Sequence, residues 1–198
     1  LLFTFEKNVH LQYNSTKEGS WKRWVGNEIQ GKTIGIVGLG AVGKELAKKS
    51  MALGMRVFAF DIFKDKDFLT THEDINFVSS LDEIYEHSDV ISLHLPHTSQ
   101  SHHMIGEEVI FEKFKRNPIL INTSRGMLVD SNALIKGLKK GRVRGYLTDV
   151  LAHEPMLDDE VLKGVENIII TPHVGSRTFQ SVERQGTMAV NNLIELIK

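Results

Sequence analysis

The sequence predicts an α/β fold, a doubly wound parallel sheet with helices on both faces in three layers. Short apolar runs recur along the chain, and most are continuous rather than alternating, as in strands buried on both faces. Amphipathic stretches of helical length separate these runs. Such alternation of strand and helix is typical of parallel sheets. No repeat or linker interrupts the pattern, so we expect one domain over residues 31–198, preceded by an arm over residues 1–30.

Six runs are the expected strands. The first, 33–37, ends directly before a glycine-rich turn. The others share its apolar character and are 56–60, 90–95, 119–122, 143–147 and 167–170.

Helices are expected between the strands. Residues 41–53 carry an apolar side opposite a charged one. The apolar side consists of Val42, Leu46, Ala47 and Leu53. Ser80, with Glu83 three residues later, predicts a capping box. Ser131 is expected to start a further helix and Gly141 to end it.

The two ends of the chain differ from the middle. Trp21 and Trp24 lie in a polar stretch after the apolar segment 1–9, which we interpret as an arm packing on the domain or on a second copy. A frayed terminus explains the same residues equally well. The tail 179–197 is predicted to be a long helix with an inward side. That side is expected to hold Val182, Ala189, Val190, Leu193 and Ile197.

Composition is that of an ordinary globular protein and argues against several function classes. The 198 residues are 41% hydrophobic and 25% charged, and a net charge of −1 gives no reason to expect nucleic acid or an anionic membrane as partner. The absence of cysteine excludes disulfides and thiolate chemistry and fits a reducing compartment, so a cytoplasmic location is expected. No apolar run reaches the roughly 18 residues of a membrane-spanning helix. No His, Asp or Glu spacing indicates a metal site.

A GxGxxG turn follows the first strand and opens the first helix. In a dinucleotide-binding turn the first glycine allows the tight bend, the second lets the backbone approach a pyrophosphate, and the third lets the helix lie close to the strand. The pyrophosphate then meets free N–H groups at the positive end of the helix dipole. The expected fold is therefore of Rossmann type. The residues of this turn expected at the cofactor are Gly38, Gly40, Ala41, Val42 and Gly43.

A P-loop is the alternative, because residues 38–44 also read GxxxxGK. The next residue is Glu45, where a P-loop needs the Ser or Thr hydroxyl that holds magnesium. Asp61 favours the dinucleotide turn, since it follows the second strand near the ~20-residue spacing of the acid that accepts ribose hydroxyls. A carboxylate there would repel a 2′-phosphate, so NAD is favoured over NADP. An ordinary turn residue at a strand end is the alternative for Asp61.

Polar side chains follow three later strands, and ligands of this architecture bind at the carboxyl ends of strands. These are Arg125 after the fourth expected strand, Asp149 and Glu154 after the fifth, and His173 after the sixth. A guanidinium can bind a carboxylate, and a histidine can give a proton to an oxygen while hydride reaches the neighbouring carbon. A carboxylate bonded to that histidine fixes its tautomer. Each residue alone is ordinary, but together they suit hydride transfer on a 2-oxo or 2-hydroxy acid.

Over essentially its whole length the chain resembles the D-2-hydroxyacid dehydrogenase family. The motifs occur in the family's order: the glycine turn, His94-Leu95-Pro96, Asn122-Thr123-Ser124-Arg125-Gly126, Leu147-Thr148-Asp149-Val150, Glu154-Pro155 and Thr171-Pro172-His173-Val174-Gly175. The resemblance implies an NAD-dependent dehydrogenase. It covers the nucleotide-binding unit alone, so the family's substrate domain is expected to be missing. We expect the isolated chain to bind NAD but to turn over substrate poorly.

The resemblance also implies residue roles. Arg125 would bind the substrate carboxylate, Glu154 would pair with the histidine, and His173 would be the acid/base. The resemblance also implies contacts with each part of the cofactor. The N–H groups of Ala41 and Val42 would bind the pyrophosphate, Asp61 the ribose, and Asp149 the nicotinamide carboxamide. Leu95, Pro96 and Ser101 would line the adenine and ribose side, and the further implied cofactor contacts are Thr123, Arg125, His173 and Gly175.

Two further expectations come from the resemblance. In the family, the arm and the nucleotide-binding unit form most of a twofold interface, which implies a homodimer with a small-molecule 2-hydroxy or 2-oxo acid as substrate. The C-terminal-binding-protein corepressors are similar to the family and keep the same Arg, Glu and His. An NAD(H)-sensing binding protein is therefore the alternative function, and the flanking sequence would discriminate between the two.

Overall fold

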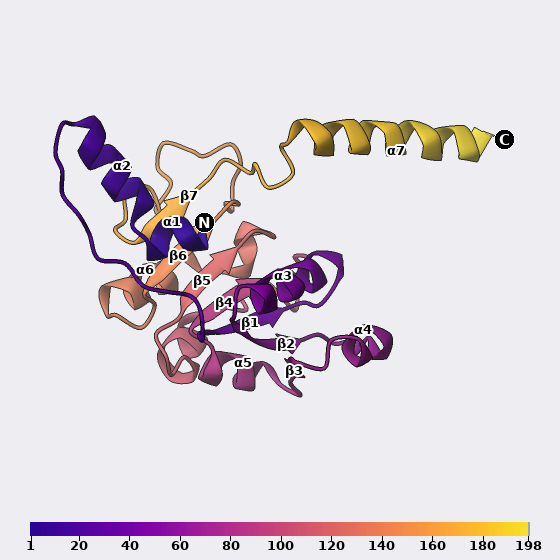
Figure 1. Ribbon diagram of the computed structural model, residues 1–198, viewed down its shortest axis with the longest axis horizontal. Coiled ribbons are helices and arrows are strands. Elements are labelled where there is room, and N and C mark those ends of the chain that lie inside the picture. Colours follow the sequence, from indigo (N-terminus) through magenta and orange to yellow (C-terminus); the bar gives the residue numbers. More distant parts are fainter. Residues whose placement is uncertain (198) are drawn as a thin grey trace.

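A sheet of seven parallel strands forms the centre of the molecule (Figure 1). The structure is a computed structural model that describes residues 1–197. The strands are β1 (Thr33–Val37), β2 (Arg56–Phe60), β3 (Ile75–Phe77), β4 (Val90–Leu93), β5 (Ile119–Asn122), β6 (Gly145–Thr148) and β7 (Ile168–Ile170). Their order is β3-β2-β1-β4-β5-β6-β7, which confirms the predicted doubly wound sheet. The strand order reverses between β1 and β4, and that is where this architecture opens a ligand crevice at the carboxyl ends.

Helices cover both faces of the sheet and complete the three predicted layers (Figure 1). One face carries α1 (Leu2–Glu6), α3 (Ala41–Ala52) and α4 (Lys66–Thr70). The other carries α5 (Leu81–His87), the π-helical turn η1 (Val109–Lys113) and α6 (Ser131–Lys139). The remaining elements are α2 (Val9–Lys17), the 3-10 turn η2 (Gly126–Leu128) and α7 (Phe179–Ile197).

Each face of the sheet has its own apolar core, because successive strand residues point to opposite faces. In β2, Val57 and Ala59 belong to the core under α3, whereas Phe58 and Phe60 pack against the core under α5. All five residues of β1 are buried. Burial on both faces explains why these strands read as continuous apolar runs.

The predicted elements are mostly confirmed, with shifts of one or two residues at their ends. β4 ends at Leu93 rather than at 95, β6 starts and ends later than the predicted 143–147, and β7 starts at Ile168. The sequence did not predict β3 or α4. β3 has three residues and α4 has five, which is too short to leave a periodic pattern.

Three of the predicted helix ends are also confirmed. Ser80 Oγ accepts a hydrogen bond from the Glu83 N–H, and the reciprocal bond completes the capping box of α5. α6 starts at Ser131, and the side chain that caps it belongs to the preceding Asp130. Gly141 follows its end with φ of +66°, a left-handed conformation that glycine adopts without strain.

The prediction for the inward side of α3 is wrong at Val42 and Leu53, whose side chains are 64% and 46% exposed. The prediction is confirmed at Ala47, which is buried, and at Leu46, which packs against the core. The other buried residues of the helix are Gly43 and Ser50. Gly43 sets the buried face because its lack of a side chain lets the helix lie against the turn. Val42 is one residue away, a rotation of about 100° around the helix, and therefore points outward.

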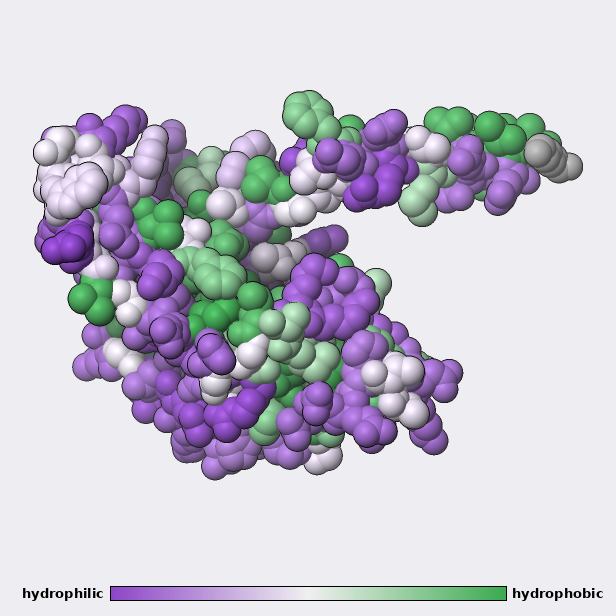
Figure 2. All heavy atoms as spheres, in the orientation of Figure 1, coloured by the Kyte–Doolittle hydropathy of each residue, from purple (hydrophilic) through white to green (hydrophobic). Residues whose placement is uncertain are grey.

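The inward side predicted for α7 is wrong as well. The helix leaves the sheet and extends into solvent, and Figure 2 shows hydrophobic side chains along it. None of its 19 residues is buried, and Val182, Ala189, Val190, Leu193 and Ile197 are all exposed. An apolar stripe predicts that a helix side can be buried, but it does not say what buries it.

The start of the chain lies on the sheet. Leu1, Leu2 and Phe5 pack against the core under α3, and the Phe5 ring occupies the space next to Gly145 in β6. Trp21, further along the arm, is 82% exposed. Among residues 1–197 no helix has both the length and the apolar character to cross a membrane.

Candidate functional site

The glycine turn joins β1 to α3 at the carboxyl edge of the sheet. Gly38 has φ of +97°, and a Cβ there would overlap the carbonyl oxygen of His94. A Cβ at Gly43 would overlap the carbonyl oxygen of Gly38, so the third glycine allows the helix to lie against the turn. A Cβ at Gly40 would meet no atom within 4 Å. The space above the second glycine is therefore open.

The residues of this turn fit a dinucleotide pyrophosphate. Gly40 is the N-cap of α3, and no side chain of the described residues caps this helix. The N–H groups in the first helical turn, at Ala41 and Val42, have no partner within a helix, and both residues are exposed. An anion placed over Gly40 would meet these donors and the positive end of the helix dipole.

Asp61 lies in the loop after β2 and reaches back to the turn. Its Oδ2 accepts a hydrogen bond of 2.6 Å from the Leu39 N–H, and its Oδ1 accepts one of 2.9 Å from the Phe63 N–H. The carboxylate therefore links the glycine turn to the next loop, at the place where the sequence predicts the ribose. The sequence did not predict this linking role.

The segment after β4 borders the turn on its other side. The Leu95 side chain approaches Gly38. Ser101 is buried, and its hydroxyl donates to the Pro96 carbonyl at 2.8 Å and accepts from the Thr98 N–H at 2.8 Å. Ser101 thus closes its own loop. Burial lowers the pKa of His94, the last residue before this loop, to about 4, which keeps it neutral in its contact with Ser92.

A histidine and a glutamate meet at the end of β6 and β7. His173 Nδ1 lies 2.7 Å from Glu154 Oε2, and Glu154 Oε1 accepts a 2.9 Å hydrogen bond from the Leu151 N–H. Burial raises the pKa of Glu154, but the bonds from His173 and Leu151 outweigh it and leave the pKa below its ordinary value. The carboxylate is ionised at neutral pH and engages one ring nitrogen, so Nε2 is left for a reacting group.

The backbone of His173 has φ of +53°, which is uncommon for a residue with a side chain. Hydrogen bonds to the Asp149 carboxylate hold this conformation. Its Oδ1 accepts from the Thr171 hydroxyl and, at 3.0 Å, from the Val174 N–H, and its Oδ2 accepts from the Gly175 N–H at 2.8 Å. Burial raises the pKa of Asp149, but these bonds lower it further than burial raises it. Asp149 therefore holds both sides of the loop that carries His173.

Arg125 follows β5, on the neighbouring strand. Its side chain is exposed, and Nη1 donates to the Ser124 carbonyl at 2.6 Å. A Cβ at Gly126 would overlap the backbone of Leu151, so the Arg125 loop lies directly against the loop that leads to Glu154. The backbone of Arg125 therefore lies next to the segment that leads to Glu154, while its guanidinium is exposed and bound to the Ser124 carbonyl.

Asn122 is a further functional candidate. It belongs to the motif that contains Arg125, but no role was predicted for it from the sequence. It is fully buried at the end of β5. Its Nδ2 donates to the Arg125 carbonyl at 2.9 Å, and its Oδ1 accepts from the Ser124 N–H at 3.1 Å. It therefore shapes the Arg125 loop. An amide at the end of an apolar strand is the signal that could have revealed it.

Three of the predicted residues line one cavity of about 340 Å³, namely Asp149, Glu154 and His173. Its apolar walls, which the sequence did not predict, include Leu151, Met156 and Ile170. Arg125 and the exposed Thr123 lie outside this cavity on the β5 side. Within residues 1–197 no group of three His, Cys, Asp or Glu side chains is arranged to hold a metal ion.

Comparisons with known proteins identify the family. The chain is 39% identical to a glyoxylate reductase of Korarchaeum cryptofilum over 98% of its own length and 59% of the relative's. Its structure resembles a glyoxylate reductase from Paecilomyes thermophila, with a TM-score of 0.89, 29% identity, and coverage of 100% of this chain and 59% of that one. It also resembles a D-lactate dehydrogenase from Aquifex aeolicus complexed with NAD and lactic acid, with a TM-score of 0.86, 32% identity, and coverage of 99% and 63%.

The chain thus spans about three-fifths of the length of these relatives. The family model described as "D-isomer specific 2-hydroxyacid dehydrogenase, NAD binding domain" matches residues 1–175, which include the glycine turn, Asp61, Arg125, Glu154 and His173. The chain belongs to the D-isomer specific 2-hydroxyacid dehydrogenase family and is its NAD-binding domain.

Proposed function

We propose that this chain is the cofactor-binding part of an oxidoreductase that transfers a hydride between nicotinamide and a D-2-hydroxy or 2-oxo acid. The contact between His173 Nδ1 and Glu154 Oε2, at the edge of the sheet that carries the glycine turn, is the observation that carries the proposal. The activities after which the relatives are named, which include glyoxylate reductase and glycerate dehydrogenase, support a small 2-oxo or 2-hydroxy acid as substrate.

The side chains have separate tasks in this reaction. When bound, the reduced dinucleotide supplies the hydride for C2 of the oxo acid. His173 holds a proton on Nε2 and gives it to the oxygen on C2, so the carbonyl becomes a hydroxyl and the imidazole becomes neutral. Glu154 fixes the ring through Nδ1 and stabilises its protonated form. Arg125 turns toward the site and binds the substrate carboxylate. In the reverse direction Nε2 takes the proton back.

The cofactor is NAD rather than NADP in this proposal. Asp61 puts a carboxylate next to the glycine turn, where ribose hydroxyls can donate to it and a 2′-phosphate would be repelled. The other assigned contacts of the dinucleotide, including Leu95, Pro96, Ser101, Thr123 and Gly175, belong to the same proposal.

The decisive experiment replaces His173 in the full-length enzyme. A panel of 2-oxo acids, including glyoxylate and pyruvate, is followed by the loss of NADH absorbance. His173→Ala should reduce kcat by about 10²–10⁴-fold on the best substrate, because general acid catalysis is lost, with NAD affinity changed little. His153→Ala, at an exposed histidine of the neighbouring loop, is the control. Near-native turnover by His173→Ala would refute the proposed acid/base role.

The proposal also assigns cofactor binding and substrate binding to different parts of the enzyme. Residues 31–198 form the NAD-binding domain, residues 1–30 form an arm, and the part of the enzyme that closes over substrate lies outside these residues. The isolated chain should then bind NAD but turn over substrate poorly. Robust dehydrogenase activity of this chain alone would overturn that assignment.

The proposed assembly is a homodimer in which the arm takes part. Support comes from apolar side chains exposed on the arm, with Phe3 at 52%, Tyr13 at 63% and Trp21 at 82%. Analytical ultracentrifugation tests this, and a monomer at tens of micromolar would contradict it. A cytoplasmic location is proposed because the chain has no cysteine, as suits a reducing compartment.

A further inference from the structure

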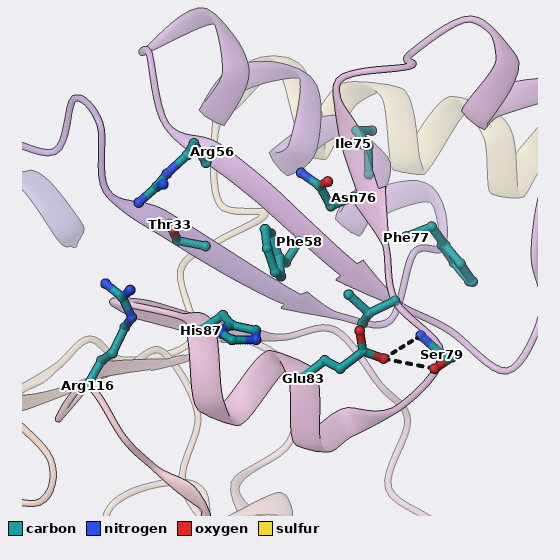
Figure 3. A pocket seen from close by; sticks show the side chains of 11 residues that line it. Thr33, Arg56, Phe58, Ile75, Asn76, Phe77, Ser79, Glu83, His87 and Arg116 are labelled. Atoms are coloured by element: carbon teal, nitrogen blue, oxygen red, sulfur yellow. Dashed lines mark hydrogen bonds between the residues drawn. The ribbon is translucent and has the colours of Figure 1, made fainter.

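A second cavity, of about 750 Å³, runs along β1, β2 and β3, from the first residues of these strands to the segment after β3 (Figure 3). Thr33, Arg56 and Ile75 line it, and they are the first residues of β1, β2 and β3. Helix α5 forms the other wall. The far end of the cavity is formed by Ser79 and Glu83, which follow β3. None of the lining residues is assigned to the dinucleotide or lines the cavity of His173, so the two sites share no residue.

One end of this cavity is cationic. Arg56 is exposed, and no carboxylate of the described chain lies within 4 Å of its guanidinium. Arg116 also lines the cavity, on the same side of the view as Arg56 (Figure 3). Asp89 links Arg116 to β1, because Asp89 Oδ1 lies 3.3 Å from Arg116 Nη1 and Asp89 Oδ2 accepts from the Thr33 N–H at 2.8 Å. Two guanidinium groups near one another can bind a carboxylate through several charge-assisted hydrogen bonds.

The middle of the cavity has an aromatic wall. Phe58 is half-buried in β2, and its ring lies at the centre of the view in Figure 3, between the arginines and Ser79. The His87 ring meets it edge-on, with centroids 5.8 Å apart and planes at 66°. A flat apolar group can lie against Phe58 in offset or edge contact.

The far end carries a carboxylate. Glu83 lies with Ser79 at the end of the cavity opposite the arginines (Figure 3), and its Oε1 accepts from the Ser79 N–H at 2.9 Å and from the Ser79 hydroxyl at 2.8 Å. These bonds lower the pKa of Glu83, so its charge persists at neutral pH. A ligand with a negative group at both ends would be repelled here.

We propose that this cavity binds a small carboxylate with one negative group and a flat apolar body. The carboxylate lies between Arg56 and Arg116, and the body lies against Phe58. Neither the dinucleotide nor the 2-oxo acid uses this site, so its occupation leaves NAD binding at the carboxyl edge unobstructed.

The test measures binding of 2-naphthoate by calorimetry to the chain already saturated with NAD. The neutral 2-naphthylmethanol and the doubly charged 2,6-naphthalenedicarboxylate are run beside it. We expect naphthoate to bind tightest. The alcohol has no charge for the arginines to bind, and the second carboxylate of the diacid would be repelled by Glu83. Amide chemical-shift changes should cluster at residues 56–58, 76–79 and 87.

Three variants make the result decisive. Arg56→Gln with Arg116→Gln should weaken naphthoate binding about tenfold or more and leave NAD affinity unchanged. Lys139→Gln with Lys140→Gln removes two exposed charges that do not line the cavity, and should have no effect. Phe58→Leu keeps an apolar side chain and should weaken all three naphthalene ligands alike.

Four outcomes would overturn the inference. Equal affinity for the acid and the alcohol would mean that the arginines do not take part. Unchanged binding in the arginine double variant would lead to the same conclusion. Competition between naphthoate and NAD, or the absence of naphthoate binding at millimolar concentration, would show that this cavity is not the site.

Discussion

His173 Nδ1 and Glu154 Oε2 lie 2.7 Å apart although they come from the loops after two different strands. Each partner is held by further bonds, Glu154 by the Leu151 N–H and the His173 loop by Asp149. Bonds within the chain itself therefore hold both partners of the pair in place. Such preorganisation is what a proton-transferring histidine needs, because its ring must not have to be reoriented during the reaction.

Replacing Glu154 tests whether this contact matters in the reaction. In the full-length enzyme, Glu154→Gln keeps the shape of the side chain but removes the charge that stabilises a protonated imidazole. We expect kcat to fall about 10–100-fold with a smaller change in KM and with unchanged NAD affinity. Steady-state kinetics and NAD titration measure both quantities.

Asp158→Asn is the matched control for Glu154→Gln. Asp158 is an exposed acid in the same loop, so its replacement should leave both kcat and KM near their native values. Equal losses in the two variants would mean that the Glu154 result reports a damaged loop rather than the contact with His173.

The second and third glycines of the turn should respond differently to alanine. Gly40 has an extended backbone and open space where a Cβ would be, so Gly40→Ala should fold normally and weaken NAD about tenfold by occupying the pyrophosphate position. Gly43→Ala should lower the melting temperature, because its Cβ would overlap the Gly38 carbonyl. Calorimetry of NAD binding and thermal unfolding separate the two effects. Unchanged NAD affinity in Gly40→Ala would show that the pyrophosphate does not lie over this residue.

Asp61 should set the choice between NAD and NADP. Asp61→Asn keeps an oxygen that can accept from the Leu39 N–H and removes the negative charge. We expect the ratio of NADP to NAD affinity to rise about tenfold, because the repulsion of a 2′-phosphate is lost. Titration of the isolated chain with both cofactors measures the ratio. If the ratio does not move, Asp61 acts only as the link between the turn and the loop after β2.

The sequence was sufficient where a feature depends on local chemistry. The glycine turn, the capping box of Ser80 and Glu83, and the buried strands follow from residue types at fixed spacing, and all are confirmed. The contact of His173 with Glu154 was expected through family resemblance, because nothing local brings the two loops together. The hydrogen bonds of Asp149 and Asn122 depend on which backbone atoms the fold brings next to these side chains. The inward side of α7 could not be predicted, since burial needs a second surface.

Glu6 connects the arm to the domain and should make the stability of the chain depend on acid pH. Its side chain is fully buried, and it binds Arg144 with Nη1–Oε2 and Nη2–Oε1 distances of 2.8 and 2.5 Å and Lys32 at 2.6 Å. Burial raises the pKa of Glu6, but these partners outweigh it and hold the pKa at about 2. The folded pKa is thus below the ordinary value of 4.5. The stabilisation is complete above about pH 4.5 and is lost as the pH falls toward 2.

Glu6→Gln should therefore lower the free energy of unfolding by about 2–4 kcal/mol at pH 7, since it leaves two cations next to a buried neutral group. The difference from the native chain should shrink as the pH falls from about 4.5 to about 2, because the native carboxylate is then protonated as well. Urea unfolding of both proteins across this pH range measures the difference in free energy.

Glu45→Gln is the matched control. The pKa of Glu45 is also about 2, but its side chain is exposed and pairs with Lys48 and Lys49 on the surface of α3. Solvent screens such pairs, so Glu45→Gln should change stability little at any pH. A pH-independent loss in Glu6→Gln would show that packing of the arm, rather than the buried charge, accounts for the effect.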